Sequence, residues 1–554
     1  MFRYISVLIL TSTLIFSCGK PSVPEEVLVA TPQETAEKLT AILREQLNDN
    51  DSLEVLVAGK DSLKASFLVK EFYKKRNFKP LYSDTCRFTG FYYMMFRVIR
   101  DAELFGLNPE HYYYTSVSNH SDSVFVPETG KYNASRLYNI ELLLTDAFFK
   151  MAHDLQAGRL SEDSLKPKWE PQNLKHSPLN LLESAVVQKR IAPLLASVEP
   201  DFPQYIDLKT EYRKFYREYS NKNWNKIPEP SDSANFLREV RNRMVIMGYL
   251  DTTQKGNDSV LLSKALKKFQ KSYFLTEDGK IGKEMIKALS YSPEFRIRQV
   301  AINLDRWRWE SAKSDKAYVW INLPGFKFTL AEADTVVMES RIICGDPKHP
   351  TPTPLTSKIT YFTIYPYWNV PYSIASKEIL PRIKWDTSYL RKNRFQVLDW
   401  NNQLVDPTTI NWKKYNEKNL PYRFRQLEGS ENSLGIVKFF FNNKEGVYLH
   451  DTNSKRLFKK EVRALSHGCV RLEEYWEFAK FLVRDDSVKI PRDTLAAWFK
   501  KNEQRIVRLK KQVPLYIKYF TAEVLNGNRL VIYPDIYGRD EKIIRRLYSE
   551  TQWL

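Results

Sequence analysis

The sequence predicts a multidomain α+β protein whose N-terminal half is helical and whose C-terminal part is rich in β-strands. With 554 residues, the chain is long enough for three or four domains of ordinary size. Apolar residues make up 43% of it, enough for several cores, which excludes a disordered tail. Apolar side chains recur at helical spacing over 142–155, whereas an alternation typical of strands begins at Tyr318.

The N-terminus has the pattern of an export signal. Arg3 precedes an apolar run, residues 4–16, that is too short to span a bilayer. Cys18 resembles the lipobox cysteine of bacterial lipoproteins, which implies a signal peptide over 1–17 and a lipid anchor on Cys18. The implied location is the periplasm of a Gram-negative bacterium, with the outer membrane favoured because residue 19 is Gly and not Asp. An ordinary secretory signal with an incidental cysteine is the alternative.

Composition and periodicity divide the rest of the chain into four parts. Residues 18–61 are rich in Pro, Glu, Thr and Asp and predict a mobile tether. Helical patterns over 62–225 predict a mainly α-helical scaffold, and a compact pattern over 232–290 predicts three short helices. A β-rich domain follows over 296–540, in which the polar stretch 372–433 is too long for a loop and predicts a capping subdomain.

The net charge of +19 favours an anionic partner: nucleic acid, an acidic membrane surface or a carboxylate-rich polymer. Arg and Trp side chains interleave over 291–310, as they do on some nucleic-acid-binding faces. The export signal removes the protein from cytoplasmic nucleic acid. We therefore interpret this stretch as an amphipathic connecting helix and expect no nucleic-acid partner.

Cys469 is the strongest candidate for a reactive side chain. Three cysteines follow Cys18, an odd number in a compartment where thiols tend to be paired, so at least one is expected to stay free. Cys86 and Cys344 lack flanking acid–base groups and are interpreted as small buried side chains. His450 ends a predicted strand nineteen residues before Cys469 and can accept the thiol proton, and Tyr448 shares its strand face.

The short loop before Cys469 has chemistry of its own. Gly468 permits a tight backbone turn, so that the N–H groups of Gly468 and Cys469 can face a developing oxyanion. A zinc site built from Cys469, His467 and His450 is an alternative, but no further ligand lies at a recognisable spacing. We therefore expect neither a metal nor a cofactor.

The string Ser466–Arg471, with His450, resembles the signature of YkuD-type L,D-transpeptidases. The similarity extends to the stretches Trp368–Pro371, Asn432–Gly435 and Tyr516–Tyr519. It implies that Cys469 is the nucleophile, that His450 is the general base, and that His467 orients the loop or polarises the thiolate. Further substrate or oxyanion contacts are implied for Gly468, Arg471, Tyr448, Ser466, Trp368 and Asn369.

Two upstream regions resemble companion domains of the large, YcbB-like members of that family. The stretches Phe72–Tyr82, Phe105–Pro109 and Leu144–Phe148 resemble their scaffold domain. Gly248–Leu250 and the turn Asp278–Gly282, each after an apolar helical stripe, resemble a peptidoglycan-binding domain. A generic three-helix bundle that acts only as a spacer is the alternative for this second region.

The resemblance implies acyl transfer in cell-wall remodelling. A tetrapeptide stem of peptidoglycan would acylate Cys469 with loss of D-alanine, and a diaminopimelate amine would then form a 3→3 cross-link. It also implies acylation by carbapenems, while partners among the wall synthases stay unknown. The same Cys–His site would equally serve an L,D-carboxypeptidase, an exchange enzyme or a protein-to-peptidoglycan ligase. A non-catalytic peptidoglycan-binding lipoprotein is the alternative from another class.

Overall fold

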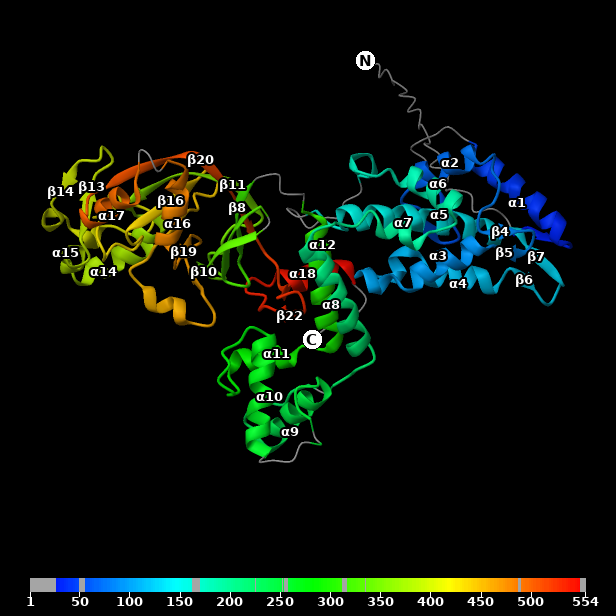
Figure 1. The fold of residues 1–554 in the computed structure, drawn as a ribbon, viewed down its shortest axis with the longest axis horizontal. Coiled ribbons are helices and arrows are strands. Elements are labelled where there is room, and N and C mark those ends of the chain that lie inside the picture. The colour runs from blue at the N-terminus through cyan, green and yellow to red at the C-terminus, as the bar shows by residue number, and fades with distance from the viewer. Residues whose placement is uncertain are drawn as a thin grey trace, which may run out of the picture. The chain divides into compact units, whose positions relative to one another are not determined.

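A computed structural model describes residues 26–48, 55–161, 170–224, 226–251, 253, 258–310, 316–333, 335–486 and 490–548 (Figure 1). The predicted signal peptide and Cys18 lie outside the described residues. The chain divides into two compact units, the first formed by residues 1–159 and 167–200 and the second by residues 160–166 and 201–554. The predicted α+β class is confirmed. Within the described ranges, no helix has both the length and the apolar character needed to cross a membrane.

The first unit is built around one buried helix, α5 (Ala134–Ala157), which is covered along most of its length. Helices packed on it surround it in Figure 1: α1 (Pro32–Leu47), α2 (Ser66–Lys75), α3 (Gly90–Arg100), α4 (Tyr114–Asp122), α6 (Pro178–Gln188) and α7 (Ala192–Ala196). Short strands join them: β1 (Leu28–Val29), β2 (Val57–Ala58), β3 (Asp61–Ser62), β4 (Ser83–Asp84), β5 (Arg87–Phe88), β6 (Phe125–Val126) and β7 (Lys131–Asn133). The apolar repeat over 142–155 therefore forms the centre of this core.

Two buried carboxylates on α5 hold the surrounding loops. Glu141 accepts hydrogen bonds from the backbone N–H groups of Leu81, Tyr82 and Ser83 at 2.8–2.9 Å. Asp146 accepts one from the backbone of Ala65 at 2.5 Å. Burial raises the pKa of both carboxyl groups, and these hydrogen bonds oppose that shift. These two carboxylates thus belong to a structural polar network.

The predicted tether over 18–61 is wrong for most of its described residues. Helix α1 begins at a capping box in which the side chains of Thr31 and Glu34 each accept from the other residue's backbone. Its apolar face buries residues such as Leu43 and Leu47 in the core of the first unit. The sequence pattern did not predict this helix, because its exposed face is rich in charged residues and because its Pro stands at the first helical position, where Pro is tolerated.

The predicted helical region over 62–225 also ends too late. Residues from 201 onward belong to the second unit, where α8 (Pro203–Tyr219) packs against α12 (Pro293–Arg308). Tyr205 and Tyr212 of α8 share a core with Trp307 of α12. The helical period alone could not show which of two cores this helix joins.

Helix α12 is buried, which corrects the interpretation of 291–310 as an amphipathic connector. Arg306 pairs with Asp540 at 2.7 Å, and Arg308 pairs with Asp305 at 2.9 Å, with all four side chains at most 5% exposed. The helix contacts α8, β21 (Ala522–Leu525) and α18 (Arg539–Leu547), and β21 pairs with β22 (Arg529–Ile532). These guanidinium groups therefore stabilise a core and offer no face to nucleic acid.

Three helices form the small domain expected near 232–290: α9 (Ser233–Ile246), α10 (Asp258–Ser272) and α11 (Lys283–Ser290). The side chain of Gln270 fixes the turn before α11, because it donates to Asp278 at 2.8 Å and accepts from the Gly279 N–H at 2.8 Å. Gly279 has a φ of +72°, and a Cβ there would lie 2.6 Å from the Ser263 hydroxyl. Gln270 of α10 therefore fixes the predicted turn Asp278–Gly282 through these hydrogen bonds.

The β-rich part is a nine-stranded sheet that closes on itself. Its order is β18-β10-β19-β17-β16-β11-β20-β8-β9, with a further pairing of β9 to β10. The strands are β8 (Ala317–Asn322), β9 (Lys327–Glu332), β10 (Thr335–Gly345), β11 (Leu355–Ile364), β16 (Val437–Phe441), β17 (Leu449–His450), β18 (Ala464–Ser466), β19 (Val470–Leu472) and β20 (Arg505–Lys518). Helices α16 (Tyr475–Val483) and α17 (Arg492–Lys500) add to its core, where Phe478 contacts Phe328 and Phe439.

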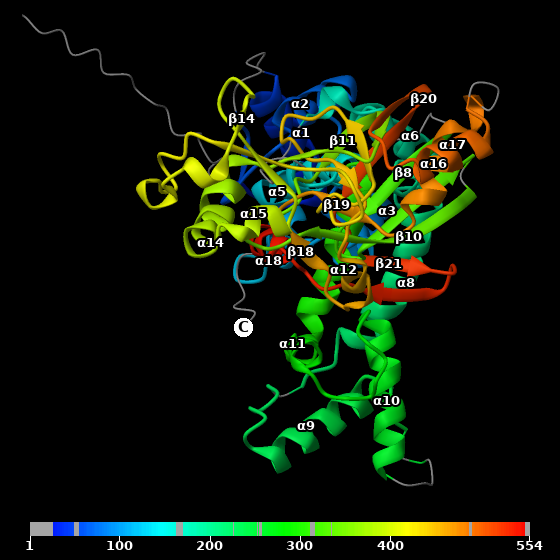
Figure 2. The same ribbon diagram turned by 90° about the vertical axis from the view of Figure 1, so that its left-hand side faces the viewer.

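An insertion between β11 and β16 has a core of its own. Its four-stranded sheet has the order β12-β15-β13-β14, with α15 packed beside β13 and α14 beside α15 (Figures 1 and 2). Its elements are β12 (Trp368–Asn369), α13 (Tyr372–Ile374), a π-helical turn (Ala375–Ile379), α14 (Leu380–Trp385), α15 (Ser388–Lys392), β13 (Phe395–Leu398), β14 (Leu404–Val405) and β15 (Arg423–Gln426). Because β12 pairs with β15, the insertion begins at Trp368, before the predicted 372. We call residues 368–426 the cap.

Candidate active site

Strands β16, β17 and β19 carry five polar or reactive side chains on one face. Lys438 and His450 are register partners across β16 and β17, and His450 and Arg471 are partners across β17 and β19. Alternate residues of these strands face the core instead: Val437, Phe439, Leu449, Val470 and Leu472. Tyr448 precedes β17 and Cys469 precedes β19, so strand alternation places both on the face of Lys438, His450 and Arg471.

The thiol of Cys469 lies against Tyr448. Burial raises the pKa of the thiol, whereas hydrogen bonds from the backbone and hydroxyl of Tyr448 lower it, as do the charges of Lys438 and Arg471. Burial also raises the pKa of the Tyr448 hydroxyl, which keeps this group a neutral donor. The site thus provides a nucleophile with a fixed hydrogen-bond donor.

His450 is buried and held in one tautomer. Its Nδ1 contacts the carbonyl oxygen of Asp451, which can only accept, so Nδ1 carries the hydrogen and Nε2 keeps its lone pair. Burial, followed by the charges of Arg471 and Lys438, lowers the pKa of His450 to about 3. The imidazole is therefore neutral at pH 7 and able to accept a proton at Nε2.

Lys438 and Arg471 are two cations on the same sheet face as the thiol, and neither has a carboxylate partner among the described residues. The Lys438 Nζ lies 3.7 Å from the centre of the Tyr448 ring, and the Nε of Arg471 is buried without an acceptor among the described residues. Burial lowers the pKa of both side chains, that of Lys438 to about 8, and the Cys469 charge raises both. The resting site is consequently rich in positive charge.

The loop between β18 and β19 is tied by side chains on both sides. The Ser466 hydroxyl donates to the Cys469 carbonyl at 2.6 Å, and Thr351 donates to the Gly468 carbonyl at 2.8 Å. Gly468 has a φ of +106°, as its predicted tight turn requires. Its N–H, however, donates back to Ser466 at 3.3 Å and so does not face an oxyanion. Ser466 thus positions the loop.

Replacing Ser466 by Ala should slow acylation of Cys469 about tenfold, because two hydrogen bonds that fix the loop are lost. The measurement is the rate at which a carbapenem, the acylating agent that the family resemblance implies, adds to Cys469 by mass spectrometry. Ser357→Ala is the matched control, since Ser357 also donates to a carbonyl, that of Asn442 at 2.6 Å, outside the loop. Equal rates in both variants would contradict the positioning role.

The His467 side chain contacts a residue of the cap. Its Nε2 lies 2.7 Å from Oε1 of Glu378, and its ring lies 4.8 Å from that of His349. Both partners of the Glu378 pair are about 40% exposed, so the pair contributes little to stability. Of the two predicted roles, orientation of the loop fits this position and direct polarisation of the thiolate does not.

The two predicted residues of the cap differ in their reach. The Trp368 side chain lies close enough to the Tyr448 hydroxyl to lower its pKa, and Tyr448 in turn acts on Cys469. Asn369 is exposed on β12, where its backbone pairs with Arg425, and its side chain makes no hydrogen bond among the residues described. The structure therefore brings Trp368 into the site and leaves Asn369 outside it.

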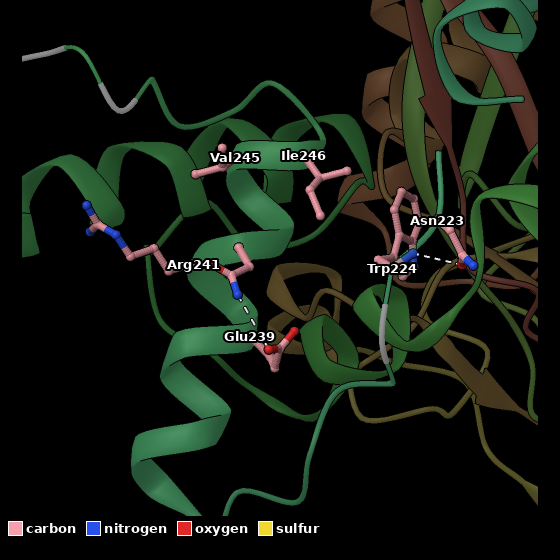
Figure 3. A pocket seen from close by; sticks show the side chains of 7 residues that line it. Asn223, Trp224, Glu239, Arg241, Val245 and Ile246 are labelled. Atoms are coloured by element: carbon pink, nitrogen blue, oxygen red, sulfur yellow. Dashed lines mark hydrogen bonds between the residues drawn. The ribbon is translucent and has the colours of Figure 1, made fainter. Parts of the chain in front are cut away.

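Other candidate sites hold no comparable chemistry. Cys344 is fully buried, and burial raises its pKa to about 12, whereas Cys86 is only partly buried. Among the described residues, no three His, Cys, Asp or Glu side chains are grouped so that they could hold a metal ion. A hollow of about 450 Å³ beside α9 contains no nucleophile (Figure 3). It is lined by Asn223, Trp224, Glu239, Arg241, Asn242, Val245 and Ile246.

Sequence reasoning missed Lys438, Thr351 and Glu378. The only signal for Lys438 was a cation inside an otherwise apolar strand, at the alternate position that faces away from the core. Thr351 lies in a Pro-rich loop over a hundred residues before the thiol, and Glu378 lies in the cap. Neither has a local pattern that could reveal its partner.

Three stretches of the chain match known protein families. Residues 68–211 match the scaffold domain, residues 233–289 the "Putative peptidoglycan binding domain", and residues 316–490 the L,D-transpeptidase catalytic domain. A protein of Haemophilus influenzae named "Putative L,D-transpeptidase" is 34% identical over 225 residues. That match covers 41% of this chain and 45% of the relative, so the chain spans less than half of that protein's length.

Two solved L,D-transpeptidase structures are similar over part of the chain. The structure from Stackebrandtia nassauensis is 16% identical, covers 54% of this chain and 94% of its own, and has a TM-score of 0.19. The structure from Mycobacterium smegmatis is 13% identical, covers 37% and 58%, and has a TM-score of 0.16. Because these TM-scores are low, the comparison with known families rests on the sequence matches alone. Residues 316–490 therefore match the YkuD family of L,D-transpeptidase catalytic domains, in a chain that also matches a scaffold domain and a putative peptidoglycan-binding domain.

Proposed function

We propose that this chain is a peptidoglycan L,D-transpeptidase that forms a thioester on Cys469. The observation that supports this most is the Cys469 thiol set against the Tyr448 hydroxyl, on the sheet face that also carries the neutral imidazole of His450. The peptidoglycan-binding match supports the substrate class. The net charge of +19 also suits a polymer whose peptide stems carry carboxylates.

In the first step, His450 Nε2 takes the thiol proton while the sulfur bonds to the carbonyl carbon of diaminopimelate in a tetrapeptide stem. The carbonyl π electrons move to its oxygen. The Cys469 N–H has no acceptor among the described residues and is the backbone donor that remains for this oxyanion. The oxyanion then collapses, the bond to the terminal D-alanine breaks, and His450 returns the proton to the departing amine.

In the second step, an amine of a neighbouring stem attacks the thioester carbon. His450 accepts the proton that the amine loses, the carbon–sulfur bond breaks, and the proton passes to the departing sulfur. The product is an amide between two diaminopimelate residues and a regenerated thiol. The contact between Glu378 of the cap and His467 of the loop supports a covered thioester, because exclusion of water favours an amine acceptor.

The test is mass spectrometry of the purified chain incubated with disaccharide-tetrapeptide. A dimer that has lost one D-alanine, with fragmentation placing the bond between two diaminopimelates, is the expected result. A tripeptide without dimer would replace transpeptidation by an L,D-carboxypeptidase activity, and added D-amino acids or protein amines would reveal exchange or ligation. No change in the stem would contradict the enzyme and favour a wall-binding lipoprotein.

We further propose that Cys18 carries a lipid anchor that holds the protein in the periplasm, probed with a Cys18→Ser variant. The wild-type protein should fractionate with membranes and show the mass of an acylated N-terminal cysteine. The variant should be released into the soluble periplasmic fraction, because one hydrogen-bonding hydroxyl cannot replace buried acyl chains. An acylated, membrane-bound Cys18→Ser protein would contradict the lipobox assignment.

A further inference from the structure

The Lys438 side chain occupies an unusual position for a lysine. It projects from the middle of an apolar strand, beside His450 on β17 and Thr363 on β11, its register partners on either side. Its Nζ lies 3.7 Å from the Tyr448 ring centre and 4.3 Å from that of Phe440. The side chain is partly exposed, yet its ammonium packs against these aromatic rings and pairs with no carboxylate among the described residues.

No carboxylate neutralises this ammonium within the described residues. Asp451, the acidic residue that follows His450, has other partners, because its Oδ2 accepts from the Ile436 N–H at 3.0 Å and its Oδ1 pairs with Lys455. Arg471 adds a second cation on the same face, and it too has no ion pair among the described residues. Both side chains are partly buried, and positive charge that is partly withdrawn from water is stabilised by a nearby anion, so the site favours a negative group beside these two cations.

Only two groups on this face can supply a negative charge. The titratable and charged groups around Lys438 are Tyr448 and His450 from β17 and Cys469 and Arg471 from β19, while β11 presents the uncharged Thr363. A phenol is intrinsically less acidic than a thiol, and burial raises the pKa of Tyr448 further. The anion that completes the site is therefore the thiolate of Cys469.

We propose that the Lys438 ammonium supplies positive charge that holds the Cys469 thiolate, so that the nucleophile does not depend on a His450 imidazolium alone for its counter-charge. The inference rests on the proposed function for its purpose, but it concerns the ionisation of the thiol and not the identity of the substrate. His450 then acts as a proton carrier that is charged only in passing. The interaction is reciprocal: Cys469 raises the pKa of Lys438, and Lys438 lowers the pKa of Cys469.

The experiment is alkylation of Cys469 in the full chain by iodoacetamide as a function of pH, followed on the Cys469 peptide by mass spectrometry. Lys438→Met keeps the length of the side chain and removes its charge. The midpoint of the alkylation profile should rise by about one pH unit, which is about a tenfold lower rate at pH 7. Lys438→Arg should restore most of the wild-type profile, because it restores the charge.

Lys358→Met is the matched control, since it removes one exposed positive charge from β11 of the same sheet. Its midpoint should equal that of the wild type. A second readout compares the anionic reagent iodoacetate with neutral iodoacetamide: the wild type should favour iodoacetate, and Lys438→Met should lose part of that preference. This ratio depends on the field at the sulfur and remains informative if the variant is less stable.

An unchanged midpoint and an unchanged reagent preference in Lys438→Met would overturn the inference. So would a Lys438→Arg variant that behaves like Lys438→Met, because the role would then belong to the shape of the side chain. Neither readout requires turnover. A chain that alkylates as expected but forms no cross-link would therefore refute the proposed function alone, and the reverse result would refute only the role of Lys438.

Discussion

Replacing Cys469 by Ala should abolish cross-link formation, with a fall in rate of at least about a thousandfold. The thioester path has no substitute nucleophile, because the Tyr448 hydroxyl beside the sulfur is kept neutral by burial. Residual activity would have to come from water or amine attack on a bound stem. The measurement is the yield of 3→3 dimer from disaccharide-tetrapeptide at matched protein concentration.

The same variant should keep its fold, since only one sulfur atom is removed from a partly exposed position. The free energies of unfolding of the variant and the wild type, measured by thermal unfolding, should agree within about 1 kcal/mol. Cys86→Ala is the matched control: Cys86 is another partly buried free thiol, but it lies in the first unit, and its removal should leave the dimer yield unchanged. A Cys469→Ala protein with wild-type yield would remove this residue from the mechanism.

Much of the fold followed from the periodicity of the sequence. The strand pattern that begins at Tyr318 identified the first strands of the closed sheet, since one of their faces lines the core. Two features were missed for the same physical reason. Helix α1 and the transfer of α8 to the second unit depend on which core receives an apolar stripe, and that choice is made by distant partners. In α9, Leu237 is half exposed, while its neighbour Phe236 is buried.

The candidate site could be predicted where its residues are close in sequence. Tyr448, His450 and the string from Ser466 to Arg471 lie within a short stretch, and strand pairing brings them together. The contribution of Lys438 depends on the register of β16 against β17, which sequence alone does not specify. The direction of the Gly468 N–H was also beyond prediction, because it depends on the Ser466 rotamer.

Asp451 positions His450, and the absence of a side chain on Gly435 leaves space for the Asp451 side chain. The Asp451 carbonyl fixes the His450 tautomer, and its carboxylate is held by Ile436 and Lys455. A Cβ on Gly435 would lie 2.2 Å from Oδ2 of Asp451 and 2.6 Å from its Cβ, so the whole side chain would have to move. Gly435 also has a φ of +62°, which is strained for any other residue.

Gly435→Ala should therefore lower the free energy of unfolding of the second unit by about 3 kcal/mol, from the clash and the backbone strain together. It should also lower dimer yield about a hundredfold, because a displaced Asp451 misplaces the base. Gly446→Ala separates the two causes: its φ is +65°, but a Cβ there meets no atom within 4 Å. That control should lose only about 1 kcal/mol and keep its activity. If the two variants unfold and cross-link alike, backbone strain is the whole effect, and the contact between Gly435 and Asp451 does not position His450.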